Sequence, residues 1–164
     1  MNPKKSIFPI TEGKLLGFIV SKNGMIIDPE RSEAIAKIGL QSSKKTMQSF
    51  LGKINFVRRF VPNFAQIVRP LQDLIKKNVL FKWSETQKDA FVKIRKSIMD
   101  APALMPPDFD KDFILYTFAT DFSYANVLTQ KHAEDTKIPI SFMSSTFIGA
   151  ELNYTQIDNQ TYTV

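Results

Sequence analysis

The stretch "SSKKTMQSFLGKINFVRRFVP" (residues 42–62) contains the clearest helical pattern in the chain and decides how the rest is interpreted. Ser43 is placed to cap a helix, and Pro62 is placed to end it. Between them, apolar side chains recur at the i, i+3, i+4 spacing of one helix face. They are Met47, Phe50, Leu51, Ile54, Val57 and Val61. The stretch therefore predicts an amphipathic helix over 44–60 that packs against a core.

The opposite face of this predicted helix carries a second pattern. A glycine inside a helix costs about 1 kcal/mol relative to alanine, and its usual benefit is the close approach of another backbone or a ligand. Amide side chains suit sugars and groove edges, and basic side chains suit phosphates. The residues that share the face are Lys45, Gln48, Gly52, Asn55 and Arg59. Two interpretations stay open: contact with a nucleic-acid duplex, or close helix packing at Gly52 beside solvated lysines.

Two lysines stand at the start of the same helix. Lys44 and Lys45 occupy the end where the helix macrodipole disfavours cations by a few tenths of a kcal/mol. A bound anion would remove this mismatch, so both lysines are candidate phosphate contacts.

Before this helix, "KLLGFIVSKNGMIID" (residues 14–28) predicts a β-hairpin. Apolar runs over 15–20 and 25–27 flank Asn23-Gly24, a pair that tolerates the positive φ of a type I′ turn. Asp28 is then placed to cap a helix over 30–38, with Pro29 at its first position.

After the central helix, the pattern predicts two more helices. Pro70 is expected to break or restart the first of them, which continues to Lys77. The second, in "WSETQKDAFVKIRKSIMDAP", opens with a capping box of Ser84 and Gln87. Ala101-Pro102 is expected to stop it.

From residue 104 the pattern changes to strands. Alternating segments predict strands at 113–118, 123–130 and 138–143, followed by a helix that begins near Thr155. Three strands and part of a helix are too little for an independent core. The fold class expected for the whole chain is α+β.

Composition and charge restrict the function. The chain has no cysteine and a single histidine, which excludes disulfides, thiolate metal sites and histidine clusters. No apolar run reaches the roughly 20 residues needed to span a bilayer, and no secretory signal opens the chain, so an intracellular protein without a membrane partner is expected. Residues 1–100 carry a net charge of +11 and residues 101–164 a net charge of −5. This asymmetry indicates that only the first part meets a polyanion.

Several ordered blocks carry a resemblance to a known family. They are "KLLGFIVSKNGMIIDPERSEAI", "MQSFLGKINFVRRFVPNFAQIVRPLQDLIKK", "FKWSETQKDAF" and "APALMPPDFDKDFIL". Together they resemble the stretch that follows the polymerase catalytic motif in gypsy-type LTR retrotransposon reverse transcriptases. The tail "PISFMSSTFIGAELNY" is similar to the start of their ribonuclease H domain, in the form found in plant elements.

The resemblance implies three units: the end of a palm with a primer-grip-like hairpin (1–28), a helical thumb and connection (29–103), and a truncated ribonuclease-H-like domain (104–164). Leu16, Gly17 and Phe18 would lie on the primer-grip hairpin. Gln48, Gly52 and Phe56 match positions where related enzymes track the minor groove of the template–primer. Phe56 lies at the edge of the polar face, so stacking on a sugar and burial in the core both stay open.

The resemblance also implies what the chain lacks. The polymerase aspartates would precede Met1, so magnesium is expected only in the complete parent enzyme. Active ribonuclease H members carry a "TDAS"-like strand and an "EKEL"-like helix, whereas this sequence has "TFAT" and "DNQT". Phe118 and Gln160 therefore stand where two acidic metal ligands belong. Asp121 and Asp158 are expected to face away from those positions, so no catalytic residue and no metal site are predicted.

The function expected is that of a non-catalytic part of a retrotransposon polyprotein. Its thumb would bind an RNA–DNA or DNA duplex, and its ribonuclease-H-like unit would act as a tether. The other partner expected is the rest of the reverse transcriptase polyprotein, in the cytoplasm, the nucleus or a virus-like particle. The alternatives are an inactive genomic remnant and a domesticated protein-interaction module.

Overall fold

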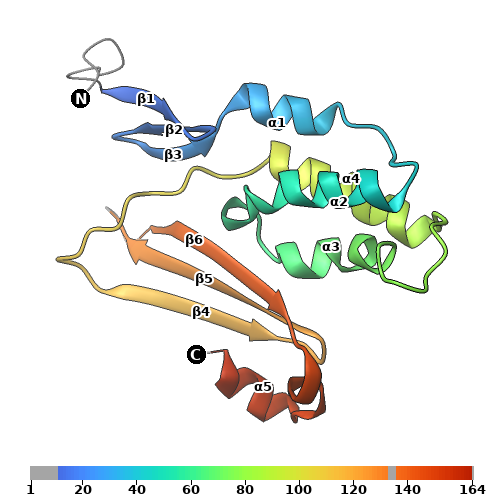
Figure 1. Ribbon diagram of the computed structural model, residues 1–164. Coiled ribbons are helices and arrows are strands. Elements are labelled where there is room, and N and C mark those ends of the chain that lie inside the picture. The colour runs from blue at the N-terminus through green and yellow to red at the C-terminus, as the bar shows by residue number, and fades with distance from the viewer. Residues whose placement is uncertain (1–10, 133–135, 164) are drawn as a thin grey trace, which may run out of the picture.

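The computed structural model describes residues 11–132 and 136–163. It shows an α+β fold of helices and two three-stranded antiparallel sheets, as the sequence predicts. In Figure 1 the sheets lie towards one side, helices α1 to α4 gather on the other, and α5 lies below the second sheet. The first ten residues of the unit predicted over 1–28 are outside the described residues, as are 133–135 and 164 in the last unit.

The first sheet contains one strand more than the sequence predicts. Its strands are β1 (Glu12–Leu15), β2 (Phe18–Ser21) and β3 (Gly24–Ile27). Leu15 pairs with Phe18, so Leu16 and Gly17 form a two-residue turn with φ of 50° and 82°. The predicted continuous strand over 15–20 is therefore wrong, because two successive left-handed residues reverse the chain inside it.

The second turn of this sheet lies one residue earlier than predicted. Ser21 pairs with Gly24, so the loop consists of Lys22 and Asn23, and the predicted type I′ turn at Asn23-Gly24 is wrong. The positive φ falls on Gly24, at 113°. A Cβ on Gly24 would lie 2.5 Å from the Leu104 carbonyl oxygen. This close approach lets the segment after α4 pair with β3 through Met25.

Local capping signals place the starts of three helices correctly. In α1 (Pro29–Ala36) the Asp28 carboxylate accepts a hydrogen bond from the Glu30 N–H, at 3.2 Å. Helix α2 (Lys44–Asn55) begins after Ser43, whose hydroxyl accepts from the Thr46 N–H. Helix α4 (Glu85–Met99) begins with the predicted capping box of Ser84 and Gln87.

The end of α2 differs from the prediction. The α-helix stops at Asn55 and does not reach Pro62. At Val57 the backbone leaves the α region (φ −98°, ψ 8°), and the chain continues as the 3₁₀ turn η2 (Arg58–Phe60). Tightening into i→i+3 hydrogen bonds is common at helix C-termini.

Helix α3 (Phe64–Asp73) passes through Pro70, so the predicted break there is wrong. Proline in a helix interior costs about 3 kcal/mol, because it removes one hydrogen bond and crowds the preceding turn. Val68 and Leu71 are fully buried on either side of it. Their burial offsets the local cost, and the helix ends at Asp73, before the predicted Lys77.

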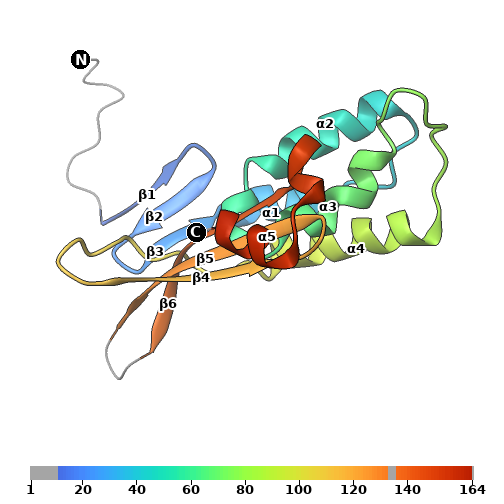
Figure 2. The ribbon, with the colours of Figure 1, turned by 90° about the horizontal axis from the view of Figure 1, so that it is seen from below.

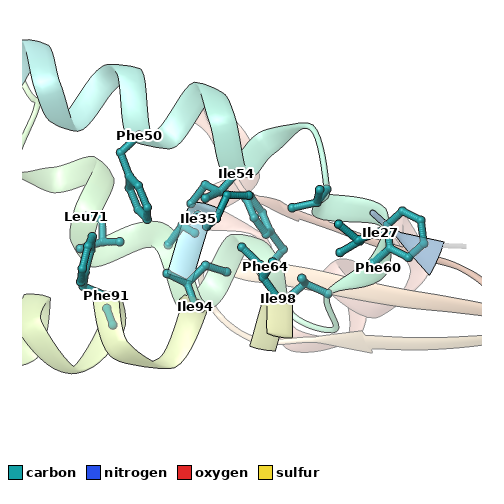
Figure 3. Packing of buried hydrophobic residues seen from close by; sticks show 14 of the residues in the cluster. Ile27, Ile35, Phe50, Ile54, Phe60, Phe64, Leu71, Phe91, Ile94 and Ile98 are labelled. Carbon is teal, nitrogen blue, oxygen red and sulfur yellow. The ribbon is translucent and has the colours of Figure 1, made fainter. Parts of the chain in front are cut away.

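One hydrophobic core joins the helices. Figure 3 shows α2 and α4 packing against each other through Phe50 and Phe91, whose ring centroids are 4.9 Å apart. The first sheet contributes Ile27 and α1 contributes Ile35. Half-buried Phe142 from the second sheet packs against the same core.

The second sheet consists of β4 (Phe113–Ala119), β5 (Ser123–Lys131) and β6 (Lys137–Thr146), so all three predicted strands are confirmed. A 3₁₀ turn that the sequence did not predict, η4 (Gly149–Asn153), precedes α5 (Gln156–Tyr162). Helix α5 begins next to Thr155, as predicted, and the Thr155 hydroxyl caps it by accepting a hydrogen bond from the Asp158 N–H.

Ser144 of β6 connects the second sheet to the helices through two hydrogen bonds. Its hydroxyl accepts a hydrogen bond from the buried Ala65 N–H at 2.9 Å, and its carbonyl accepts from Arg58 Nη2 at 2.8 Å. Beyond Leu104, the apolar side chains that are buried in the described residues are Ala119 and Phe147. The sheet therefore depends on the helices for much of its apolar cover. Figure 2 shows α5 on the other side of the sheet.

Candidate nucleic-acid interface

The outer face of α2 presents the predicted polar stripe. Lys45, Gln48, Gly52 and Asn55 are all exposed, while Met47, Phe50 and Ile54 on the opposite face are buried. A duplex that lay along α2 would meet one cation, two amides and a glycine in succession. We call these four residues the α2 stripe.

Gly52 lies at the centre of the α2 stripe and faces open space. No heavy atom comes within 4 Å of the position that a Cβ would occupy there. The alternative of close helix packing at Gly52 therefore has no partner in the described part of the chain. The helix carries a residue of low helix propensity at a position where the fold itself does not require it.

Lys44 has a partner within the chain. Its Nζ donates a hydrogen bond to the Lys76 carbonyl oxygen at 2.5 Å, which joins the start of α2 to the segment after α3. The Ser43 hydroxyl already accepts the Thr46 N–H at this helix end. Lys45 is more exposed, and of the two lysines it is better placed to meet a phosphate.

Arg59 is not on the α2 stripe. It belongs to η2, beyond the end of the α-helix, so the helical spacing that grouped it with Asn55 does not apply. Its exposed side chain borders a cavity of about 180 Å³ between the first sheet and the segment after α4. Arg59 therefore adds a second exposed cation beyond the end of α2, beside the hairpin, and we call Lys45 and Arg59 together the basic surface.

Phe56 is neither a core residue nor a ring with free faces. It is 38% exposed, yet its ring stacks on Phe18 with centroids 4.6 Å apart and an angle of 6° between the planes. The Arg31 guanidinium lies over the same ring, 4.1 Å from its centroid. A sugar would have to displace one of these partners to stack on Phe56. Arg31 and the contact between Phe18 and Phe56 were missed in the sequence, because no local pattern connects these residues.

The hairpin tip lies beside this stack. Leu16 is 78% exposed at the turn, and a Cβ on Gly17 would lie 2.5 Å from Arg31 Nη1. Lys14 fixes the hairpin to α1 through contacts of 3.1 Å with Asp28 and Glu30. The hydrogen bond to Glu30, followed by that to Asp28, raises the pKa of Lys14 above its usual range.

The two positions aligned with ribonuclease H ligands are not brought together. Phe118, 59% exposed, lines up across the sheet with Ala125 and Ser144, so it lies on the face that meets α3. Helix α5, which carries Gln160, covers the opposite face, where the Asn126 side chain donates to the Thr163 carbonyl.

These residues do not fit a metal site. Phe118 has no ligand atom, and Gln160 offers only a neutral amide. The Asp158 carboxylate accepts hydrogen bonds from the Thr155 hydroxyl and N–H, at 2.6 and 3.2 Å, so it serves the helix cap. Asp121 lies in the turn after β4 and not within the strand. Within residues 11–132 and 136–163, no three acidic or histidine side chains gather as a metal site requires.

Comparison with known proteins decides the family. Residues 83–164 match the RNase H-like domain found in reverse transcriptase. The chain belongs to this family. The predicted relationship to LTR retrotransposon reverse transcriptases is confirmed by the Tf2-3 and Tf2-4 transposon polyproteins of Schizosaccharomyces pombe, each 32% identical over 160 residues. The match covers 98% of this chain but only 12% of each polyprotein.

Two solved structures share the fold. A foamy viral protease-reverse transcriptase in complex with RNA/DNA hybrid matches 98% of this chain and 22% of its own, with a TM-score of 0.81 and 28% identity. The same kind of enzyme in complex with dsDNA matches 94% of this chain and 32% of its own, with a TM-score of 0.77 and 28% identity. No described helix of this chain has the length and apolar character needed to cross a membrane.

Proposed function

We propose that this reverse-transcriptase chain holds a template–primer duplex along the α2 stripe. The observation that carries the proposal is the exposed, unfilled position of Gly52 between Gln48 and Asn55. A backbone without a side chain admits a groove edge, and the flanking amides supply donors and acceptors to it. The foamy viral relatives, which are described in complex with RNA/DNA hybrid and with dsDNA, support a duplex as the ligand.

The ribonuclease-H-like part would act as a tether that does not cut the duplex. Under this proposal residues 1–28 are the end of a palm, 29–103 a thumb and connection, and 104–164 the tether. Ser144 supports it, because its two hydrogen bonds connect β6 to Ala65 and Arg58 near the thumb helices. The remainder of a polyprotein would supply polymerase activity, and its magnesium ions, as the second partner.

Charge reversal on the basic surface tests the proposal. Lys45→Glu and Arg59→Glu are each expected to weaken binding of an RNA–DNA hybrid about fivefold to tenfold at 50 mM salt, because each removes a phosphate contact and adds a repulsion. Fluorescence anisotropy with a labelled hybrid measures the effect. Lys53→Glu is the matched control, since Lys53 is an exposed lysine of α2 that lies off the stripe.

The outcomes separate the proposal from its alternatives. If all three variants weaken binding equally, the interaction depends on net charge and not on the stripe. A chain that binds no hybrid even at low salt supports the protein-interaction module instead.

A further inference from the structure

Arg31 of α1 reaches the surface that α2 presents. Phe56 follows Gly52 by one helical turn, so the two residues are neighbours on the same side of α2. The Arg31 guanidinium lies 4.1 Å from the Phe56 ring centroid and is therefore held beside the α2 stripe, although it comes from another helix. The sequence separates Arg31 from Gly52 by a loop and most of α2, and only the fold joins them.

The contacts of Arg31 hold its orientation. The Phe56 ring lies against the guanidinium and also stacks on Phe18 of the hairpin. Gly17 leaves room for Nη1, since a Cβ there would lie 2.5 Å from that atom. Arginine stacks on aromatic rings while its in-plane N–H groups remain available as donors.

The charge of Arg31 is not neutralised by a carboxylate. None of the ion pairs among the described residues includes Arg31, whereas nearby Lys14 contacts both Asp28 and Glu30. A planar guanidinium with free in-plane donors matches the geometry of a phosphate group. Its place over Phe56, one helical turn from Gly52, sets it where the backbone of a duplex on the α2 stripe would pass.

We propose that Arg31 binds a backbone phosphate of the duplex, with Phe56 as the support that holds the guanidinium in place. This inference rests on the proposed function of the α2 stripe. It assigns Phe56 the role of a positioning residue, which acts on the duplex through Arg31 and does not stack on a sugar. The hairpin tip, the end of α2 and the phosphate contact then form one connected site.

The salt dependence of binding tests the inference. Each phosphate contact contributes about 0.9 to the slope of log K against log salt for a B-form duplex. Arg31→Gln is expected to reduce that slope by about 0.9 for a DNA duplex and to weaken binding about fivefold at 100 mM salt. Phe56→Leu is expected to weaken binding by nearly as much as Arg31→Gln does. The double variant is expected to bind no more weakly than Arg31→Gln alone.

Arg95→Gln is the matched control, because Arg95 also lies over a phenylalanine ring, 5.4 Å from the centroid of Phe91, but on α4 across the core from α2. Arg31→Lys keeps the positive charge, so it distinguishes the loss of a phosphate contact from a general folding defect. It is expected to retain the slope while losing part of the affinity.

If Lys45→Glu weakens binding but Arg31→Gln behaves like Arg95→Gln, the inference is wrong and the proposed function stands. Additive losses in the double variant would instead make Phe56 a direct contact, and absence of duplex binding would overturn both proposals.

Discussion

Replacing Phe91 by alanine is expected to lower the free energy of unfolding by about 3–5 kcal/mol, the usual cost of removing a buried phenylalanine from a packed core. Phe91 is 1% exposed, and its ring lies 4.9 Å from Phe50 and 5.7 Å from Trp83, measured between centroids. The cavity would open between α2 and α4, where the Phe91 ring meets Phe50. Urea denaturation followed by circular dichroism and by the fluorescence of Trp83 measures the loss.

Val92→Ala is the control for this prediction. Val92 follows Phe91 on the same helix but is 62% exposed, so its truncation is expected to change stability by no more than about 0.5 kcal/mol. Because the second sheet shares the helical core through Phe142, strand and helix signals are expected to disappear in one transition. Separate transitions, or equal effects of Phe91→Ala and Val92→Ala, would contradict a single shared core.

The elements that the sequence predicted well are those set by local chemistry. Asp28, Ser43 and Thr155 each accept a hydrogen bond from a backbone N–H a few residues away, and Gln87 accepts one from the Ser84 N–H, so their spacing alone locates the start of a helix. The strands of the second sheet were predicted for a similar reason, since alternation is a property of neighbouring residues.

The errors occur where distant contacts override local preference. Pro70 stays inside α3 because Val68 and Leu71 are buried around it. Leu16 adopts a left-handed conformation that leucine rarely takes, in a turn that places Gly17 against Arg31. Val68 and Leu71 are buried in a core that several helices build, and Arg31 is distant from Gly17 in the sequence, so propensity alone points to the wrong structure.

The candidate site also contains one part that local spacing predicts and one part that only distant contacts create. Lys45, Gln48, Gly52 and Asn55 were grouped by helical spacing, and the structure places all four on the exposed face of α2. The stack of Arg31, Phe56 and Phe18 joins a helix, the end of another helix and a strand. Such a group becomes visible only when the chain is folded, because no periodicity connects its members.

Substitutions at Gly52 are expected to move stability and binding in opposite directions. Gly52→Ala is expected to stabilise the chain by about 0.5–1 kcal/mol, because alanine has the higher helix propensity and no atom obstructs its Cβ. Gly52→Leu is expected to weaken hybrid binding about 30-fold, or roughly 2 kcal/mol, because its side chain would hold the duplex away from the helix. Thermal denaturation and fluorescence anisotropy on the same samples measure the two effects.

Lys53→Leu provides the comparison for Gly52→Leu. It introduces the same side chain at the next position of α2, on an exposed part of the helix that lies off the stripe. Although Lys53→Leu also removes a charge, it is expected to weaken binding less than threefold, since bulk matters only where the duplex approaches the backbone. A glycine that served folding alone would give the reverse result: Gly52→Ala would destabilise the chain, and Gly52→Leu would bind hybrid as well as Lys53→Leu does. The sign of the stability change and the difference between the two leucine variants therefore decide whether Gly52 serves duplex binding or folding.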